Sequence, residues 1–245
     1  MDLLEVKDVS RRFGGLTALY HLSFSLHKDE ILGIIGVNGA GKTTAFNIIT
    51  GFLHPNEGHI HFNGSDITGL RPDQICKLGL VRTFQVVKPF PGISVLDNVI
   101  IGAHNRILER SSARRKAVEI IKFLEMEPWM DQMAGSLPLA IRKRLEIARA
   151  LATDPKLLLL DEAMSGLLPG EIETMIVLIN RIREQGIALL LVEHVMKVIM
   201  SLADRIVVIH RGEKIAEGTP QEIAHNQHVI TAYLGKVKLN VDTAG

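Results

Sequence analysis

The chain has 245 residues, enough to bury one large hydrophobic core or two smaller ones. Hydrophobic residues make up 47% and charged residues 22%, as in ordinary globular proteins, and a net charge of +1 excludes a general attraction to nucleic acid. The single cysteine excludes an internal disulfide and suits a reducing compartment. No uncharged apolar run reaches the ~18 residues that span a bilayer, and the acidic start lacks the basic segment of a secretory signal. We therefore expect a chain that only a partner could hold at a membrane.

Strand-like segments of two kinds recur along the chain. Alternating apolar residues predict half-buried strands at 22–26 and 59–62, and Asn63-Gly64 after the second predicts a tight turn. Continuous apolar runs predict buried strands of a parallel sheet, and they lie at 30–35, 157–160, 187–192 and 206–209.

Helical patterns occupy the intervening sequence. Helices are predicted at 43–51 and 171–185, and the sequence from Thr219 to Glu222 forms a capping box that starts another helix. Residues 90–152 are mostly helical in pattern. This arrangement predicts an α/β core interrupted by a helical insertion.

A glycine-rich run directly follows the predicted strand at 30–35. It fits the pattern G-x-x-x-x-G-K-[ST], and its residues are Gly36, Val37, Asn38, Gly39, Ala40, Gly41, Lys42, Thr43 and Thr44. The glycines let backbone N–H groups approach an anion, and the following helix adds the positive end of its dipole. Lys42 is predicted to reach the β- and γ-phosphates of a nucleotide, and Thr43 to place its hydroxyl on Mg²⁺. A glycine-rich surface turn is the alternative, which the strand–loop–helix context disfavours.

Two adjacent carboxylates, Asp161 and Glu162, follow the buried strand at 157–160. Ligands of open parallel sheets bind at this carboxyl edge. Asp161 is predicted to hold Mg²⁺, usually through water, and Glu162 to polarise an attacking water. An isolated Asp-Glu pair would be a solvated strand end, but here it lies downstream of a phosphate loop, which favours the metal site.

With these two motifs in place, the chain resembles the ATP-binding subunits of ABC transporters over essentially its whole length. Two further segments match the Q-loop and H-loop of that family in order and spacing, Arg82-Thr83-Phe84-Gln85 and Val192-Glu193-His194. The resemblance implies a RecA-like P-loop NTPase core with an antiparallel β subdomain and a helical insertion subdomain. It divides the chain into an ATPase domain at 1–240, with core 1–88 and 153–240 and helical subdomain about 89–152, followed by a tail at 241–245.

The resemblance also assigns roles to single residues. It implies that Gln85 contacts Mg²⁺ and the attacking water and senses the transmembrane partner, that His194 bonds to the γ-phosphate, and that Phe13 stacks on adenine. Each residue has a plainer interpretation by itself: a surface glutamine, a helix-capping or buried histidine, a core phenylalanine. Their joint order around the nucleotide motifs favours the functional interpretation, with Glu162, His194, Gln85 and Lys42 as the catalytic set.

The segment that should carry the family's signature, L-S-G-G-Q, departs from it. The downstream sequence from Arg144 to Arg149 fixes the register and places Leu137-Pro138-Leu139-Ala140-Ile141 there. Proline offers neither a hydroxyl nor an N–H, so the grip of this segment on a phosphate is expected to be weak. We expect the following helix to be intact and Ser136 to cap it.

This departure bears on assembly, because each ATP of an ABC dimer lies between one subunit's phosphate loop and the other's signature. We therefore expect a heterodimer with a second ABC ATPase subunit of consensus signature, in which this chain supplies Lys42, Asp161 and Glu162; a homodimer is the alternative. Ala163 and Leu168 also replace the usual proline and the usual aspartate or asparagine of the family.

Within the family, the resemblance is strongest to the ATPases of branched-chain amino acid importers. It implies ATP and Mg²⁺ as cofactors, transmembrane permease subunits as partners, a solute-binding protein as an indirect partner, and a peripheral place on the cytoplasmic face of the plasma (inner) membrane, without nucleic acid. ATPases of urea or amide importers and of lipopolysaccharide export have nearly the same pattern. A regulatory, poorly hydrolysing ABC module and a soluble, non-transport ABC ATPase remain alternatives.

Overall fold

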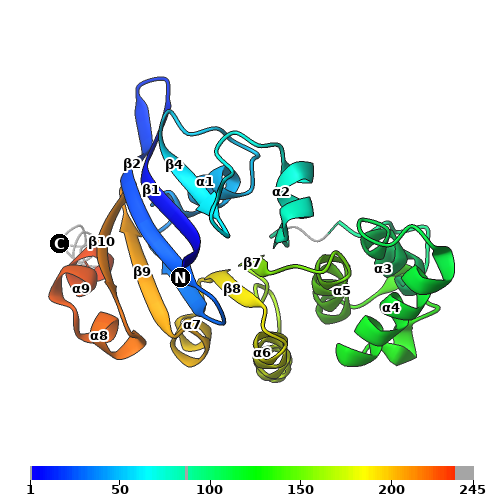
Figure 1. The fold of residues 1–245 in the computed structure, drawn as a ribbon. Coiled ribbons are helices and arrows are strands. Elements are labelled where there is room, and N and C mark those ends of the chain that lie inside the picture. Colours follow the sequence, from blue (N-terminus) through cyan, green and yellow to red (C-terminus); the bar gives the residue numbers. More distant parts are fainter. Residues whose placement is uncertain (1, 86–87, 235–245) are drawn as a thin grey trace. The chain divides into compact units, whose positions relative to one another are not determined.

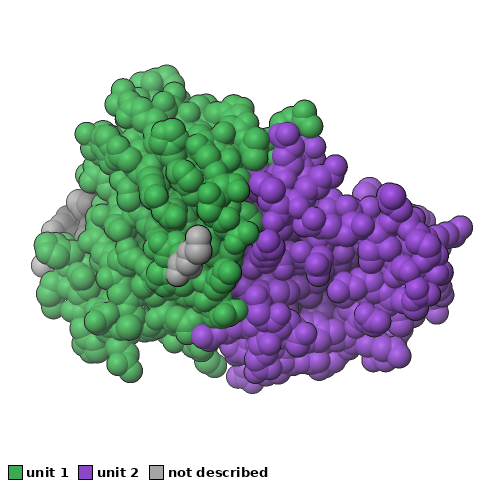
Figure 2. Space-filling view, viewed as in Figure 1, with its two compact units in different colours: residues 1–71, 190–245 green, residues 72–189 purple. Residues whose placement is uncertain are grey.

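The computed structural model describes residues 2–85 and 88–234, so the predicted tail at 241–245 lies outside the described residues. The chain divides into two compact units (Figure 2): unit 1 comprises residues 1–71 and 190–245, and unit 2 comprises residues 72–189. The second boundary falls inside strand β8 (Ala188–Val192), which lies at the predicted strand 187–192. No helix in the described part of the chain is long and apolar enough to cross a membrane.

Unit 1 contains a four-stranded antiparallel sheet with the order β2-β1-β4-β5. Its strands are β1 (Asp2–Phe13), β2 (Leu16–His27), β4 (Glu57–Phe62) and β5 (Ser65–Asp66). The predicted strand 22–26 is the C-terminal part of β2, which is longer than its apolar alternation indicated. Asn63 (φ 49°) and Gly64 (φ 81°) both adopt the left-handed conformation between β4 and β5, which confirms the predicted tight turn.

A second set of strands in unit 1 carries the loop of interest. The fully buried strand β3 (Ile31–Ile35) pairs in parallel with β9 (Arg205–His210), and β9 pairs in antiparallel with β10 (Glu213–Gly218). Helix α7 (Met196–Leu202) lies against β3, since a Cβ added to Gly33 would stand 3.2 Å from the Ile199 side chain. Helix α1 (Lys42–Ile49) follows β3, as predicted, and α8 (Pro220–His225) and α9 (Gln227–Leu234) lie beside β10 (Figure 1).

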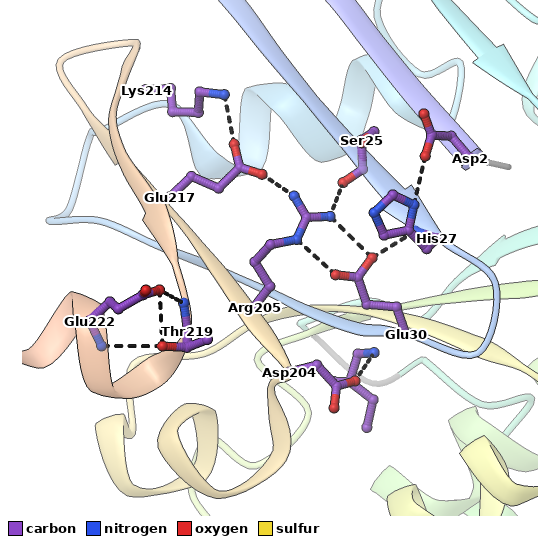
Figure 3. A network of polar contacts seen from close by, with 11 residues as sticks. Asp2, Ser25, His27, Glu30, Asp204, Arg205, Lys214, Glu217, Thr219 and Glu222 are labelled. Atoms are coloured by element: carbon purple, nitrogen blue, oxygen red, sulfur yellow. Dashed lines mark hydrogen bonds and ion pairs between the residues drawn. The ribbon is translucent and has the colours of Figure 1, made fainter.

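A polar network joins the two strand sets of unit 1 (Figure 3). Arg205 on β9 donates to Glu30 Oε1 at 2.9 Å and Oε2 at 3.1 Å, and to the Ser25 carbonyl oxygen at 2.7 Å, and it also pairs with Glu217 on β10. Glu30 accepts a further bond from the His27 backbone N–H at 2.6 Å. The hydrogen bonds that Arg205 donates to Glu30, together with the charges of Glu30 and Glu217, raise the pKa of Arg205 above its usual value. The Arg205 guanidinium therefore connects β9, through hydrogen bonds and ion pairs, with β10, with the end of β2 and with Glu30 directly before β3.

Unit 2 consists mainly of helices around a short parallel strand pair. Strand β6 (Leu80–Arg82) pairs with β7 (Leu157–Asp161), with Arg82 opposite Leu159. The helices are α2 (Pro72–Leu78), α3 (Val95–Ala103), α4 (Arg110–Phe123), α5 (Leu139–Leu151) and α6 (Pro169–Glu184), with single 3₁₀ turns at Glu127–Trp129 and Ala134–Ser136. Helices α3, α4 and α5 pack on one another within the stretch 90–152, where the sequence predicted helices.

The first residues of two helices, α8 and α5, test two capping predictions. The capping box at Thr219 is confirmed, because Thr219 Oγ1 accepts from the Glu222 backbone N–H and Glu222 accepts from the Thr219 backbone N–H. The prediction that Ser136 caps the helix after the signature segment is wrong. Helix α5 begins at Leu139 with Pro138 at its N-cap, while the Ser136 hydroxyl donates to the Met133 carbonyl oxygen at 2.9 Å inside its own 3₁₀ turn.

Candidate nucleotide site

The glycine-rich loop lies between β3 and α1 in unit 1, and close backbone contacts require two of its glycines, Gly36 and Gly41. A Cβ on Gly36 would overlap the carbonyl oxygen of Ile209, and a Cβ on Gly41 would stand 2.7 Å from the carbonyl oxygen of Ala18. Gly41 also has φ 111°, which side-chain-bearing residues rarely adopt. The backbone path therefore depends on glycine at both positions.

The Lys42 side chain folds back onto the start of this loop. Its Nζ donates to the carbonyl oxygens of Gly36 at 2.7 Å and Val37 at 3.2 Å, and the residue is buried. Lys42 is the first residue of α1, whose N-cap, Gly41, has no side chain to accept from the first-turn amides. Amides at the positive end of a helix beside a buried ammonium group fit an anionic phosphate.

The other loop residues differ in how far they are exposed to solvent. Thr43 and Thr44 lie in the first turn of α1, with Thr43 exposed and Thr44 partly buried, while Asn38 and Gly39 are exposed at the bend and Ala40 is buried. A hydroxyl presented at the exposed face of this turn is a suitable oxygen ligand for Mg²⁺.

Unit 2 holds the two carboxylates at the carboxyl end of β7. The Asp161 side chain, 7% exposed, accepts from Arg82 Nη2 at 2.6 Å, so a buried guanidinium compensates its charge. Glu162, just beyond the strand, accepts at Oε2 from Gln85 Nε2 at 2.6 Å. The structure thus brings three predicted residues together, Gln85, Asp161 and Glu162, on the ends of two adjacent strands.

Arg82 contacts Asp161, and the sequence motifs did not predict this contact. Arg82 lies at the end of β6, and the Thr83 backbone N–H then donates to the Leu159 carbonyl oxygen at 2.9 Å, which keeps the segment beside β7. Arg82 pairs with Asp161, and Gln85 three residues later pairs with Glu162. The sequence offered one signal for this contact, namely that the cationic residue Arg82 stands three positions before the predicted site residue Gln85.

Phe13 and His194 belong to unit 1. Phe13 ends β1, is 43% exposed, and carries the Arg11 guanidinium 4.8 Å above its ring centroid. An exposed ring backed by a cation offers a face for stacking. His194 is exposed and follows β8 by two positions.

The divergent signature segment leads into α5 in unit 2. Leu137, Ala140 and Ile141 are buried, whereas Leu139 is 37% exposed, and a Cβ on Gly166 would stand 3.1 Å from the Leu139 side chain. The first turn of α5 has no side-chain cap. The segment therefore presents apolar groups where the family pattern has a hydroxyl and glycines.

Comparison with known proteins identifies the class. The profile of the ABC transporter family matches residues 19–165, and the chain belongs to that family. A profile described as branched-chain amino acid ATP-binding cassette transporter matches residues 213–238. The chain is 37% identical to the high-affinity branched-chain amino acid transport ATP-binding protein BraF of Pseudomonas aeruginosa and 38% identical to the corresponding LivG of Escherichia coli, over 96% of this chain and 98% of each relative.

Solved structures agree with this assignment. A nucleotide-free ATP-binding cassette from an ABC transporter aligns with a TM-score of 0.87 at 32% identity, over 95% of this chain and 99% of that one. An ATP-binding cassette in its ADP conformation aligns equally well, with a TM-score of 0.87 at 32% identity over 96% and 99% of the two chains. The predicted fold class is confirmed, and so is the prediction of an ABC-type ATP hydrolase.

Proposed function

We propose that this chain is the ATP-binding and ATP-hydrolysing subunit of an importer for branched-chain amino acids. The choice of branched-chain amino acids as the solute depends on one observation. The chain is similar, over nearly the whole of both chains, to two proteins named for branched-chain amino acid transport. The match at 213–238 supports the same class of solute.

The proposed phosphate-binding residues are those of the glycine-rich loop, with Lys42 as the cation that meets the β- and γ-phosphates. The buried Nζ, now held by loop carbonyls, supports this role, because a phosphate oxygen is a stronger acceptor for it. Thr43, Gln85 and Asp161 are the proposed holders of Mg²⁺, since all three offer the oxygen ligands that this ion prefers. When bound, Mg²⁺ would neutralise charge on the phosphates. Phe13 is proposed to stack on the adenine.

In the proposed reaction Glu162 orients and polarises the attacking water as general base. Gln85 supports that role by its bond to the Glu162 carboxylate, which holds the carboxylate in one orientation. Charge that develops on the γ-phosphoryl group would be met by Lys42 and His194. The water's proton passes to Glu162 as its oxygen bonds to phosphorus and the bond to the β-phosphate oxygen breaks.

We propose that the chain works as a heterodimer with a second ABC ATPase subunit, bound to transmembrane permease subunits on the cytoplasmic face of the membrane. The apolar segment 137–141 supports the heterodimer, because Pro138 and Ala140 cannot supply the hydroxyl and the close backbone approach that a facing γ-phosphate requires. The helical subdomain at about 89–152 is proposed as the part that transmits motion to the permease, and a solute-binding protein would act through that permease.

Reconstitution tests the proposal. The chain, its partner ATPase and the permease subunits encoded beside it would be placed in vesicles with the cognate solute-binding protein. We expect leucine, isoleucine or valine to stimulate ATP hydrolysis and to be taken up, and Glu162→Gln to abolish both. Stimulation by urea or short amides instead, or lipopolysaccharide extraction without a solute-binding protein, would contradict the proposed solute and favour that substrate in its place.

The divergent signature also favours a second candidate, a regulatory ABC module that binds ATP and hydrolyses it poorly. In that case the assembled complex would keep its turnover after Glu162→Gln in this chain and lose it after the matching change in the partner. A soluble, non-transport ATPase would not copurify with permease subunits at all.

A further inference from the structure

Glu162 has an unusual backbone conformation. Its φ of 50° places it in the left-handed region, which glutamate rarely adopts unless contacts with neighbouring groups compensate for the strain. The residue directly follows Asp161, the last residue of β7. The chain therefore turns sharply at Glu162, and the groups that fix this turn also fix the direction of its carboxylate.

Two donors hold the carbonyl oxygen of Glu162. Lys143 Nζ donates to it at 2.8 Å, and the Ser165 backbone N–H donates at 3.2 Å. Lys143 is 5% exposed, so its ammonium group makes this bond away from bulk water. A charged donor in a poorly solvated place makes a stronger bond than a neutral one, and Lys143 is thus the stronger of the two anchors.

Lys143 comes from α5, the helix that starts directly after Pro138. At the other end of Glu162, the carboxylate is held by Gln85 from the segment after β6. The backbone of Glu162 is therefore attached to one element and its side chain to another. A shift of α5 would move the carbonyl while Gln85 retained the carboxylate.

We propose that Lys143 is a positioning residue for ATP hydrolysis, because its bond to the Glu162 carbonyl oxygen holds the left-handed turn that directs the Glu162 carboxylate to the attacking water. This inference rests on the proposed function, since it takes Glu162 as the base. It adds that α5 sets the geometry of the chain's own base, although the segment that leads into this helix has lost the phosphate-binding groups of the signature.

The test measures ATP hydrolysis by the assembled transporter with Lys143→Met, which keeps the length and packing of the side chain and removes the donor. We expect kcat to fall about 10- to 100-fold, because a small misplacement of a catalytic group has effects of this size. The KM for ATP and the dissociation constant of MgATP should stay within about twofold, because no phosphate contact changes. Lys143→Arg, which keeps a charged donor, should recover most of the lost kcat.

Arg144→Met is the matched control. Arg144 lies on the same helix and also donates to a backbone carbonyl oxygen, that of Leu124 at 3.4 Å. Its replacement removes one basic side chain and one carbonyl contact of α5 without touching Glu162, so wild-type kcat is expected. An equal loss of kcat in both variants would show a general effect on α5 and would overturn the inference.

Glu162→Gln separates this inference from the function on which it rests. Lys143→Met should lower kcat in the wild-type background and have no further effect beside Glu162→Gln, since both act on one step. Normal turnover with Glu162→Gln would refute the base itself. An inactive Glu162→Gln complex together with wild-type kcat in Lys143→Met would refute only the role of Lys143. Where Lys143→Met does not fold, Lys143→Leu takes its place, because leucine also lacks a donor, and wild-type kcat there overturns the inference equally.

Discussion

Gly41→Ala probes the close packing of the phosphate loop. The new Cβ would stand 2.7 Å from both the Ala18 carbonyl oxygen and the Leu19 side chain, so the loop would have to withdraw by about 0.7 Å to restore ordinary contact. The backbone at φ 111° would add strain of about 1–3 kcal/mol. With about 1–3 kcal/mol more for the overlap, the unfolding free energy should fall by about 2–6 kcal/mol.

Thermal unfolding with and without MgATP is the assay. For a chain of this size, about 3 kcal/mol corresponds to a fall in Tm of roughly 6–12 °C. Wild-type protein at about 100 times its dissociation constant of MgATP gains about 2.7 kcal/mol, and the displaced loop should lose most of this gain.

Gly64→Ala serves as the control for strain alone. Gly64 has φ 81° but open space around a built Cβ, so its replacement should lower Tm less and leave the MgATP effect unchanged. The reasoning fails if Gly41→Ala and Gly64→Ala lower Tm equally, or if Gly41→Ala keeps the full stabilisation by MgATP.

Three further predictions concern charged groups. Glu30→Ala removes both bonds to the Arg205 side chain and should lower the unfolding free energy by about 3 kcal/mol, seen as a lower Tm, whereas the exposed Glu213→Ala should change it by less than about 0.5 kcal/mol. Arg82→Met should destabilise by about 3–5 kcal/mol because Asp161 loses a buried counter-charge, and adding Asp161→Asn should restore part of the loss in the same melting assay; no recovery would argue against that pair. Glu109 caps α4, and hydrogen bonds from the side chains of Ser111 and Ser112, together with those from their backbone N–H groups, lower its pKa from 4.5 to about 2. A lowered carboxyl pKa contributes stability above pH 4.5 that is lost as the pH falls toward 2, so NMR titration should show Glu109 ionised at pH 3, and a midpoint near 4.5 would contradict the cap.

Local sequence predicted the elements that carry the site. The run of buried residues in β3, the loop before Lys42 and the turn at Asn63-Gly64 each depend on neighbours in sequence, so periodicity and turn chemistry suffice to find them. Strand β1 was not predicted, because Asp8 has φ 55° and the pairing register shifts on both sides of it, which breaks the alternation of apolar residues.

The polar contacts of the site could not be predicted in the same way. Arg82 meets Asp161 across 79 positions, and Lys143 meets the Glu162 carbonyl across 19, so both depend on which elements the fold places side by side. The prediction for Ser136 is wrong for a related reason, because its hydroxyl donates to the Met133 carbonyl oxygen within its own 3₁₀ turn and does not cap α5. The two nucleotide motifs and the family resemblance predicted the site residues, and the structure showed the contacts of Lys42, Asp161, Glu162 and Gln85.

Titration calorimetry of the purified, folded chain with MgATP tests the central claim most directly, namely that the loop from Gly36 to Thr44 holds a nucleoside triphosphate. We expect a saturable heat below millimolar ATP, and at least tenfold weaker binding for Lys42→Ala, because that variant loses the buried cation at the mouth of the loop. No heat at millimolar MgATP, or equal affinity for the two proteins, would contradict the claim.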